Sequence, residues 1–417
     1  MATSRANARQ AVPRQNGFDA GQRENGANVK RRVRKAVPKP VAVSETGTMD
    51  YAMLAIVLIL VCIGVVMVFS ASYMMTANSA RFSHNPFFFF SRGIVWAGIG
   101  FVAMLILANF DYRVIRPLSW IFYCVAAALL IAVAIVGVAS GGATRWLEIP
   151  VIGQFQPSEL ARPGLIFMLA FLVEKFPKMT GNIPGLAFLL CVVGLLAGLI
   201  ALPGGLSVAI IVTIIGVGMI AIASPHFKWF VGLGGLGAAA VGLFLWWDST
   251  TGGTFRGRRF SAWLDPFSDP LVSGYQIIQS LFAIASGGWF GLGLGQSRQA
   301  SFVPEPHNDI IFAIIVEELG FIGAVFIILL FAVFIWRGVI IAMRAPDTFS
   351  SMAALGIVFA IGIQAVINIA VVTNSIPNTG VNLPFISYGG TSLIISMAMV
   401  GVLLNISKHS VKKDAVA

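Results

Sequence analysis

Long apolar segments dominate the chain, and their length predicts helices that cross a membrane. Each runs for roughly 20 residues, which is what an α-helix needs to span the hydrocarbon core. They do not alternate polar and apolar residues over about ten positions, as the strands of a membrane barrel do. We therefore predict an all-α polytopic membrane protein with ten transmembrane helices, at 51–72, 91–110, 117–139, 159–175, 183–202, 206–224, 228–247, 308–337, 350–373 and 384–406.

Composition supports this class and separates off the two ends of the chain. Only 11% of the 417 residues are charged, about half the fraction of a soluble domain, and the net charge is +11. Residues 1–50 are rich in Arg, Lys, Asn and Gly and lack an apolar period, so we expect a disordered basic tail. Beside a first transmembrane helix, such a tail favours contact with anionic lipid and not with nucleic acid.

The distribution of Lys and Arg predicts the orientation. The connections that would lie inside, together with the tail at 407–417, carry Arg113, Arg116, Lys175, Lys178, Lys228, Arg337, Arg344, Lys408, Lys412 and Lys413. The opposite connections carry almost none outside one long loop. The positive-inside rule therefore places both termini in the cytoplasm and the loop 248–307, between the seventh and eighth helices, outside.

The outer loop holds two Asp-Pro pairs, Asp265-Pro266 and Asp269-Pro270. Because proline disfavours the α conformation in the residue before it, each Asp is expected on a turn or an extended segment. Either carboxylate could cap a turn or act in catalysis. The loop also carries Arg256, Arg258, Arg259 and Arg298, which could face an anionic ligand or lipid head groups.

Two further clusters place ionisable residues next to predicted spans, where charge is costly and often functional. Glu159 and Arg162 are three residues apart after a helix opening at Pro157-Ser158, so they could form a structural ion pair or a polar site. The second cluster runs through Glu305, His307 and Asp309 into Glu317-Glu318. His307 is a weak candidate metal ligand, together with Glu305 or Asp309, and Asp309 could cap the eighth span.

The sequence lacks the motifs of several enzyme classes. The chain has no Walker A sequence, no GxSxG, no CxxC and only four histidines, which argues against nucleotide hydrolysis, serine hydrolysis and redox chemistry. Cys62, Cys124 and Cys191 fall within apolar segments and are expected to serve packing. Transport, or acid–base transfer chemistry at the outer face of a membrane, remains.

The ordered motifs resemble those of the SEDS family (shape, elongation, division and sporulation) across residues 51–406. The resemblance rests on Gln156–Glu159, Asp265–Pro270 with Ser273–Gln276, Pro304–Asp309, Glu317–Gly320 and Leu383–Ser392. Pro304–His307 and the basic tail resemble the division members more than the elongation or sporulation members. The resemblance implies a ten-helix peptidoglycan glycosyltransferase that acts on lipid II in the bacterial cell membrane, at the division septum. A lipid II flippase and a division scaffold are the alternatives.

The resemblance also assigns roles. The family's catalytic Asp matches Asp269, and its polar pair matches Glu159 and Arg162, although the basic residue is usually Lys. A Lys that some division members carry in a Pro-x-x-Gly turn is Thr379 here. The implied partners are a class B penicillin-binding protein transpeptidase and divisome regulators.

The reaction joins a sugar C4 hydroxyl to the C1 of another sugar with inversion, so one general base suffices, and Asp269 is the candidate. The departing pyrophosphate needs positive charge, for which Arg145, Arg162, Arg258 and Arg259 are candidates, with a divalent cation such as Mg or Mn as a possible cofactor. Gln156, Ser387 and Tyr388 are further candidates for substrate binding. Asp265, Glu305, His307, Asp309 and Glu317 complete the candidate residues.

Overall fold

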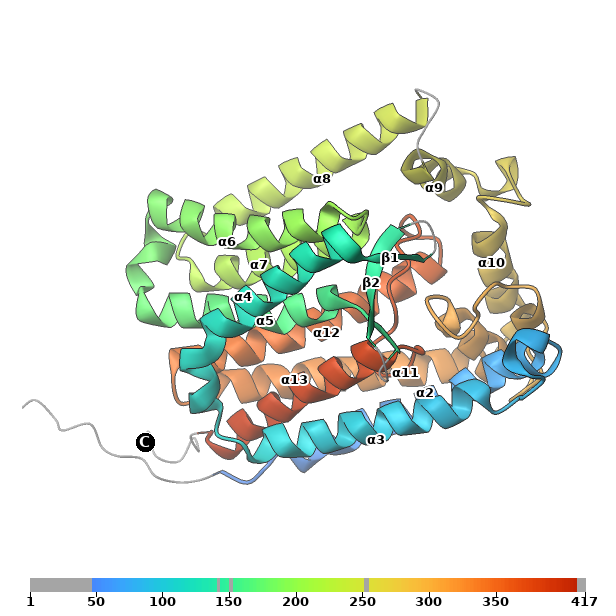
Figure 1. Cartoon of the computed structure of the whole chain (residues 1–417), viewed down its shortest axis with the longest axis horizontal. Coiled ribbons are helices and arrows are strands. Elements are labelled where there is room, and N and C mark those ends of the chain that lie inside the picture. Colours follow the sequence, from blue (N-terminus) through green and yellow to red (C-terminus); the bar gives the residue numbers. More distant parts are fainter. Residues whose placement is uncertain (1–46, 141–142, 150–152, 251–254, 411–417) are drawn as a thin grey trace, which may run out of the picture. The chain divides into compact units, whose positions relative to one another are not determined.

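A computed structural model describes residues 47–140, 143–149, 153–250 and 255–410. Each of the ten predicted segments contains a long helix (Figure 1). These helices are α2 (Tyr51–Ala77), α3 (Phe88–Asn109), α4 (Tyr112–Val136), α5 (Pro157–Lys175), α6 (Ile183–Ala201), α7 (Leu206–Ala223), α8 (Phe227–Thr250), α11 (Ile311–Met343), α12 (Thr348–Val372) and α13 (Gly390–Lys408). Most of the predicted tail 1–50 lies outside the described residues.

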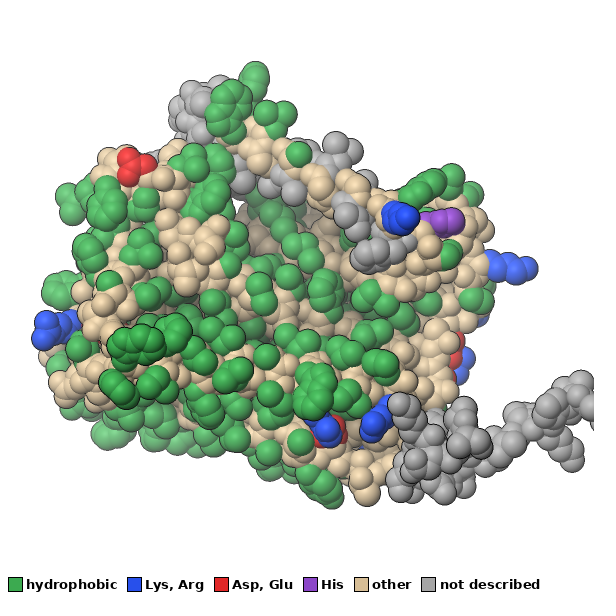
Figure 2. All heavy atoms as spheres, turned by 180° about the vertical axis from the view of Figure 1, so that it is seen from behind, with side chains coloured by type: hydrophobic (Ala, Val, Ile, Leu, Met, Phe, Trp, Pro, Cys, Tyr) green, Lys and Arg blue, Asp and Glu red, His purple; other side chains and the backbone are tan. Residues whose placement is uncertain are grey.

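Eight helices among the described residues are long and apolar enough to cross a membrane, namely α2, α3, α4, α6, α7, α11, α12 and α13. Of the other two long helices, α8 has many side chains outside the described residues, and α5 is too charged to meet these criteria. Helix α5 carries four charged residues, Glu159, Arg162, Glu174 and Lys175. The chain is thus a multi-pass membrane protein, and apolar side chains cover most of the face in Figure 2, where the few charged ones lie mostly toward its edges.

Short polar side chains begin several helices. Asp50 accepts a hydrogen bond from the backbone N–H of Met53 at the start of α2, and Asp347 forms a reciprocal capping box with Ser350 at the start of α12. Asn182 accepts from Gly185 at the start of α6. These caps satisfy N–H groups that the first helical turn leaves without partners.

The connection between α4 and α5 contains a small sheet, so the prediction of a wholly α-helical chain was incomplete. The strands β1 (Val138–Ser140), β2 (Ala143–Ile149) and β3 (Gly153–Phe155) pair antiparallel in the order β1-β2-β3. Its strands are three to seven residues long. Such short strands leave little period-2 pattern in the sequence.

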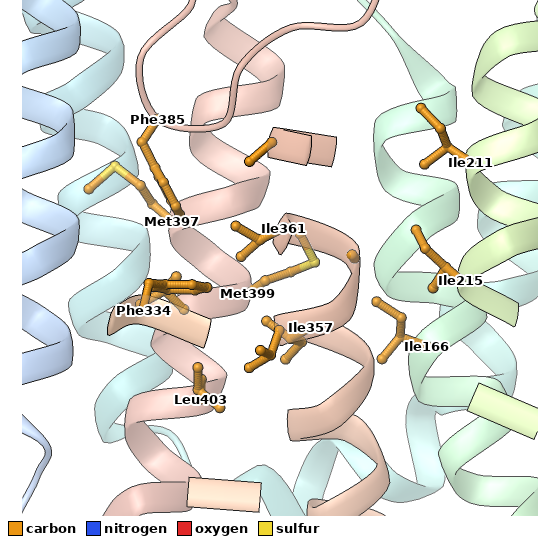
Figure 3. Packing of buried hydrophobic residues seen from close by; sticks show 14 of the residues in the cluster. Ile166, Ile211, Ile215, Phe334, Ile357, Ile361, Phe385, Met397, Met399 and Leu403 are labelled. Carbon is orange, nitrogen blue, oxygen red and sulfur yellow. The ribbon is translucent and has the colours of Figure 1, made fainter. Parts of the chain in front are cut away.

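The apolar core lies between the central helices. In Figure 3, Ile166 of α5 lies on the same side of α12 as Ile211 and Ile215 of α7, and all three are buried. On the other side of α12, Phe334 of α11 and Met397, Met399 and Leu403 of α13 pack in the same way, together with Phe385 from the segment before α13. Cys62, Cys124 and Cys191 are free and exposed on the surface of the helices.

Helices α3 and α13 lie side by side (Figure 1). Asn405 of α13 donates to the carbonyl of Ala108 at the end of α3 and accepts from the N–H of Tyr112 at the start of α4. Near by, the N–H of Asp50 donates to the hydroxyl of Ser407 at 3.0 Å. The start of α2 and the end of α13 therefore lie at the same end of the bundle.

Two helix boundaries differ from the prediction for a physical reason. Helix α13 begins at Gly390 and not at residue 384 as predicted. Residues 384–389 are irregular, and because most of them are buried, their apolar side chains extended the predicted span. Helix α11, predicted as one continuous segment at 308–337, is broken at Gly320, whose φ of 71° and ψ of −172° are non-helical. The break lies nine residues after the start of the helix.

Candidate active site

The long loop folds into short elements at one end of the bundle. They are α9 (Phe255–Leu264), η3 (Pro266–Ser268), α10 (Tyr275–Gly287) and η4 (Gln299–Ser301). Figure 1 shows α9 and α10 at the opposite end from the last turn of α13. The remaining short helices are η1 (Ala80–Phe82) and η2 (Pro177–Gly181).

Asp269 follows η3 and is held on a turn before α10. Its Oδ2 accepts hydrogen bonds from the N–H of Ser273 at 3.1 Å and from the hydroxyl of Ser273 at 2.8 Å. Its carbonyl accepts from the N–H of Gly274, where a Cβ atom would lie 2.0 Å from the carbonyl oxygen of Pro266. Glycine is therefore required at position 274, and the turn holds the half-buried carboxylate in one orientation.

Asp265 has the simpler of the two roles considered for it. Its Oδ1 accepts from the N–H of Phe267 at 3.1 Å, which caps η3, and its side chain is exposed. The two Asp-Pro pairs therefore differ in surroundings. Asp265 is an exposed cap, whereas Asp269 is half-buried and bonded to a serine hydroxyl.

A chain of polar groups runs from the loop into the bundle through Asp309. The Nε2 of Gln276 in α10 donates to Oδ1 of Asp309 at 3.2 Å, and Asn378 donates to Oε1 of Gln276 at 2.9 Å. On the other side, Asn368 of α12 donates to the carbonyl of Asp309 at 2.6 Å. Asp309 does not cap α11, which begins after Ile310 without a side-chain cap.

Burial raises the pKa of Asp309, while the hydrogen bond from Gln276 and the charge of Arg259 offset part of that effect. Arg259 of α9 lies against the Pro-x-x-Gly turn and donates to the carbonyl of Asn378 at 3.4 Å. The side chains of Arg145 and Arg258, also predicted near the pyrophosphate, lie outside the described residues. Arg298 is described, and its side chain is exposed.

Glu159 and Arg162 form the ion pair predicted from their spacing. Both side chains are buried near the start of α5, and Arg162 also donates to Oε1 of Gln364 in α12. A buried ion pair is favourable only when further hydrogen bonds satisfy it, and Gln364 supplies one. Gln156 occupies the N-cap position of α5, and its side-chain amide donates to the Ser158 hydroxyl.

His307 is buried and packs between Phe89, whose ring centroid lies 4.1 Å away, and Tyr388. Burial lowers the pKa of His307 to about 4. The carbonyl of His307 accepts from the N–H of Tyr388, and the hydroxyl of Ser387 donates to the carbonyl of Asn308 at 2.7 Å. These contacts join the segment before α11 to the segment before α13.

Glu305 and Glu317 have structural partners. Glu305 accepts from the amide of Asn308 at 2.7 Å and is exposed. Glu317 is fully buried and accepts from the hydroxyl of Ser297 and the N–H groups of Arg298 and Gln299, which fastens the loop to α11. Its neighbour Glu318 accepts from the hydroxyl of Ser70 in α2, so both adjacent glutamates have hydrogen-bond partners.

No group of three or more His, Cys, Asp or Glu side chains that could hold a metal occurs among the described residues. Gln364 and Asn368, which connect Arg162 and Asp309 to the same helix, were not predicted. Their signal was present as two amides one turn apart in the apolar stretch 354–372.

These features define the class of the protein: a helical multi-pass membrane protein whose charged and amide side chains meet between a folded loop and helices α5 and α12. A family model described as "Cell cycle protein", covering FtsW, RodA and SpoVE, matches residues 50–412. The chain belongs to this family, the SEDS family, and the resemblance drawn from its motifs is confirmed.

The relatives include both sporulation and division proteins. The chain is 42% identical to stage V sporulation protein E of Bacillus subtilis (strain 168) over 367 residues, which cover 87% of this chain and 97% of that protein. It is 36% identical to the probable peptidoglycan glycosyltransferase FtsW of Geobacter sp. (strain M18), with 86% and 96% covered. These identities do not separate a division role from a sporulation role.

Two solved structures share the fold. One, described as "Structural coordination of polymerization and crosslinking by a peptidoglycan synthase complex", matches with a TM-score of 0.71 and 27% identity, covering 86% of this chain and 97% of that one. The rod shape determining protein RodA of Thermus thermophilus matches with a TM-score of 0.64 and 24% identity, covering 90% and 100%. The second likeness supports the fold alone.

Proposed function

We propose that this chain is a peptidoglycan glycosyltransferase that polymerises lipid II, with Asp269 as the general base. The observation that carries the proposal is the oriented, half-buried Asp269 carboxylate in a chain whose family includes enzymes of this name. The exposed Asp265, which caps η3, is the less suitable of the two.

In the proposed step, the oxygen of the acceptor's C4 hydroxyl attacks C1 of the donor sugar. The same hydroxyl gives its proton to the Asp269 carboxylate. The new C–O bond forms while the bond between C1 and the pyrophosphate oxygen breaks. Undecaprenyl pyrophosphate leaves with the bonding electron pair, so one displacement inverts C1. A positioned carboxylate that takes this proton accelerates such a step by roughly 10²–10⁴-fold.

Arg259 is the described arginine best placed to meet a departing pyrophosphate, because it lies on the loop side of the network, half-buried beside Asn378. Arg162 bonds to Glu159 and Gln364 inside the bundle, so we assign it a supporting role. A Mg or Mn ion would have to take most of its oxygen ligands from phosphate and water, because the described residues offer no cluster of three. We assign it no step.

We further propose ten membrane spans, with the folded loop outside and both termini in the cytoplasm. The meeting of Asp50 with Ser407 supports an even number of spans. By analogy with its relatives, the enzyme would work in the bacterial cell membrane at a septum, with a crosslinking transpeptidase of the class B penicillin-binding type and divisome regulators. A synthase complex described for a similar structure supports the first partner.

Polymerisation of lipid II by the purified protein tests the base, with Asp269→Asn compared with its matched control Asp265→Asn. We expect the first change to reduce the rate by roughly 10²-fold or more, because it removes the proton acceptor, and the second to leave most of it. Equal activity of Asp269→Asn and the wild type would overturn the assignment. Transfer of labelled lipid II across empty vesicles without polymerisation would instead favour a flippase, and neither activity would favour a scaffold.

A further inference from the structure

Helix α12 carries two buried side-chain amides one turn apart in an otherwise apolar stretch. Gln364 is 3% exposed and Asn368 is 1% exposed. Burying an amide costs free energy unless hydrogen bonds replace those to water. Both amides therefore need partners inside the bundle.

Their partners are backbone carbonyls of the irregular segment that precedes α13. The Nδ2 of Asn368 donates to the carbonyl of Val381 at 2.7 Å, and the Nε2 of Gln364 donates to the carbonyl of Asn382 at 2.8 Å. One face of α12 thus holds two consecutive carbonyls. The same two side chains also reach charged residues: Asn368 through the carbonyl of Asp309, and Gln364 through Arg162.

Residues 376–389 explain why these bonds are needed. This segment contains no helix or strand, yet Val381, Leu383, Phe385 and Ile386 are buried. In a membrane protein, non-helical backbone within the bundle must find its hydrogen-bond partners on neighbouring elements. Ser387 serves the same end locally, since its hydroxyl accepts from the N–H of Leu383 and donates to the carbonyl of Asn308.

We propose that Gln364 and Asn368 are positioning residues of the transferase site. They fix the backbone at Asp309 and at residues 381–382, and they connect this backbone to the Arg162–Glu159 pair in α5. The catalytic consequence rests on the proposed function. The structural consequence, an ordered 381–382 segment, does not depend on it.

Four variants separate the bonds. Asn368→Asp keeps the size of the side chain but loses both donated bonds, and Asn368→Leu removes all polar contact. Gln364→Glu keeps an acceptor for Arg162 while losing the donor to Asn382, and Gln364→Leu loses both. The matched control is Ser119→Ala, because Ser119 is fully buried but bonds only within its own helix, to the carbonyl of Ile115.

We expect both Asn368 variants and Gln364→Leu to lower kcat for lipid II polymerisation about tenfold or more, because small displacements of an active site are costly. KM should stay within about twofold, because no substrate contact is removed. Gln364→Glu should lower kcat less than Gln364→Leu does, because it keeps the acceptor for Arg162. An equal loss of kcat in Ser119→Ala, or a change in KM alone, would overturn the positioning role.

A double-mutant cycle distinguishes positioning from general destabilisation. Asn368→Leu should lower kcat little further in a Gln364→Leu background, because both side chains hold the same 381–382 backbone, whereas independent effects would multiply. Amide hydrogen exchange over 303–310 and 376–389 gives a readout that needs no substrate. Faster exchange in both Asn368 variants, but not in Ser119→Ala, supports the inference, and unchanged exchange sinks it. A wild type that fails to polymerise lipid II would sink the proposed function alone.

Discussion

At position 307, an imidazole ring lies between the rings of Phe89 and Tyr388, away from water. The sequence offered it as a metal ligand beside Glu305 or Asp309. In the fold, Glu305 is exposed and bonded to Asn308, while the carboxylate of Asp309 bonds to Gln276. Its burial between aromatic rings gives this histidine a packing role. The polar residues on either side of it in the sequence had suggested a ligand role instead.

A dependence of stability on pH follows from this burial. The pKa of His307 falls from 6.5 to about 4, so the fold disfavours the protonated ring. The stability that this neutral ring contributes is complete above pH 6.5 and is lost as the pH falls toward 4. We expect the Tm in detergent to fall across this window, and His307→Phe to show a smaller fall because it keeps the ring without the charge. Parallel pH profiles of the two proteins would contradict this account.

At the scale of elements, the break in α11 joins the loop to the bundle. At Gly320, the freed N–H groups of Phe321 and Ile322 donate to the carbonyls of Gly288 and Trp289. In return, the N–H groups of Leu292 and Gly293 donate to the carbonyls of Glu317 and Glu318. The loop thus replaces hydrogen bonds that the broken helix lacks, as a membrane-embedded backbone requires.

Gly320→Ala is expected to be strongly destabilising. The φ of 71° with an extended ψ is a conformation that alanine disfavours, and a Cβ atom there would lie 2.4 Å from the N of Gly291. We expect a loss of about 1–3 kcal/mol of stability, seen as a lower Tm. The control is Gly98→Ala, where a helical Cβ atom meets nothing within 4 Å and the Tm should hold or rise. Similar losses in both variants would argue against strain at the break.

The helices were predictable from the sequence, because a membrane span leaves an apolar run of fixed length. The sheet was not, since β3 has only three residues. The break at Gly320 was not either, since a single glycine within a helical pattern does not by itself mark a break. At the site, the Glu159–Arg162 pair followed from helical spacing. Gln364 and Asn368 did not, because their role depends on the path of a segment that arrives from elsewhere in the chain. The prediction that Asp269 is the base remains to be tested.

For the whole molecule, the proposed topology predicts which surfaces are reached from each side of the membrane. In a chain in which Cys62, Cys124 and Cys191 are replaced by alanine, Ser268→Cys lies at the loop end, and Lys178→Cys lies in η2 beside the end of α5. Both positions are exposed. A membrane-impermeant maleimide applied to intact cells should label the first cysteine and spare the second until the cells are opened. The reverse pattern would invert the proposed orientation.

The pairing of α3 with α13 also means that α3 is synthesised well before its partner helix. Roughly 280 residues separate the end of α3 from the start of α13, which at about 5–20 residues per second take tens of seconds to translate. During that interval, the carbonyl of Ala108 and the N–H of Tyr112 lack Asn405, and the buried Met104 lacks its packing against the last helix. Until the final helix is made, the nascent chain therefore lacks the partners of this helix–helix contact.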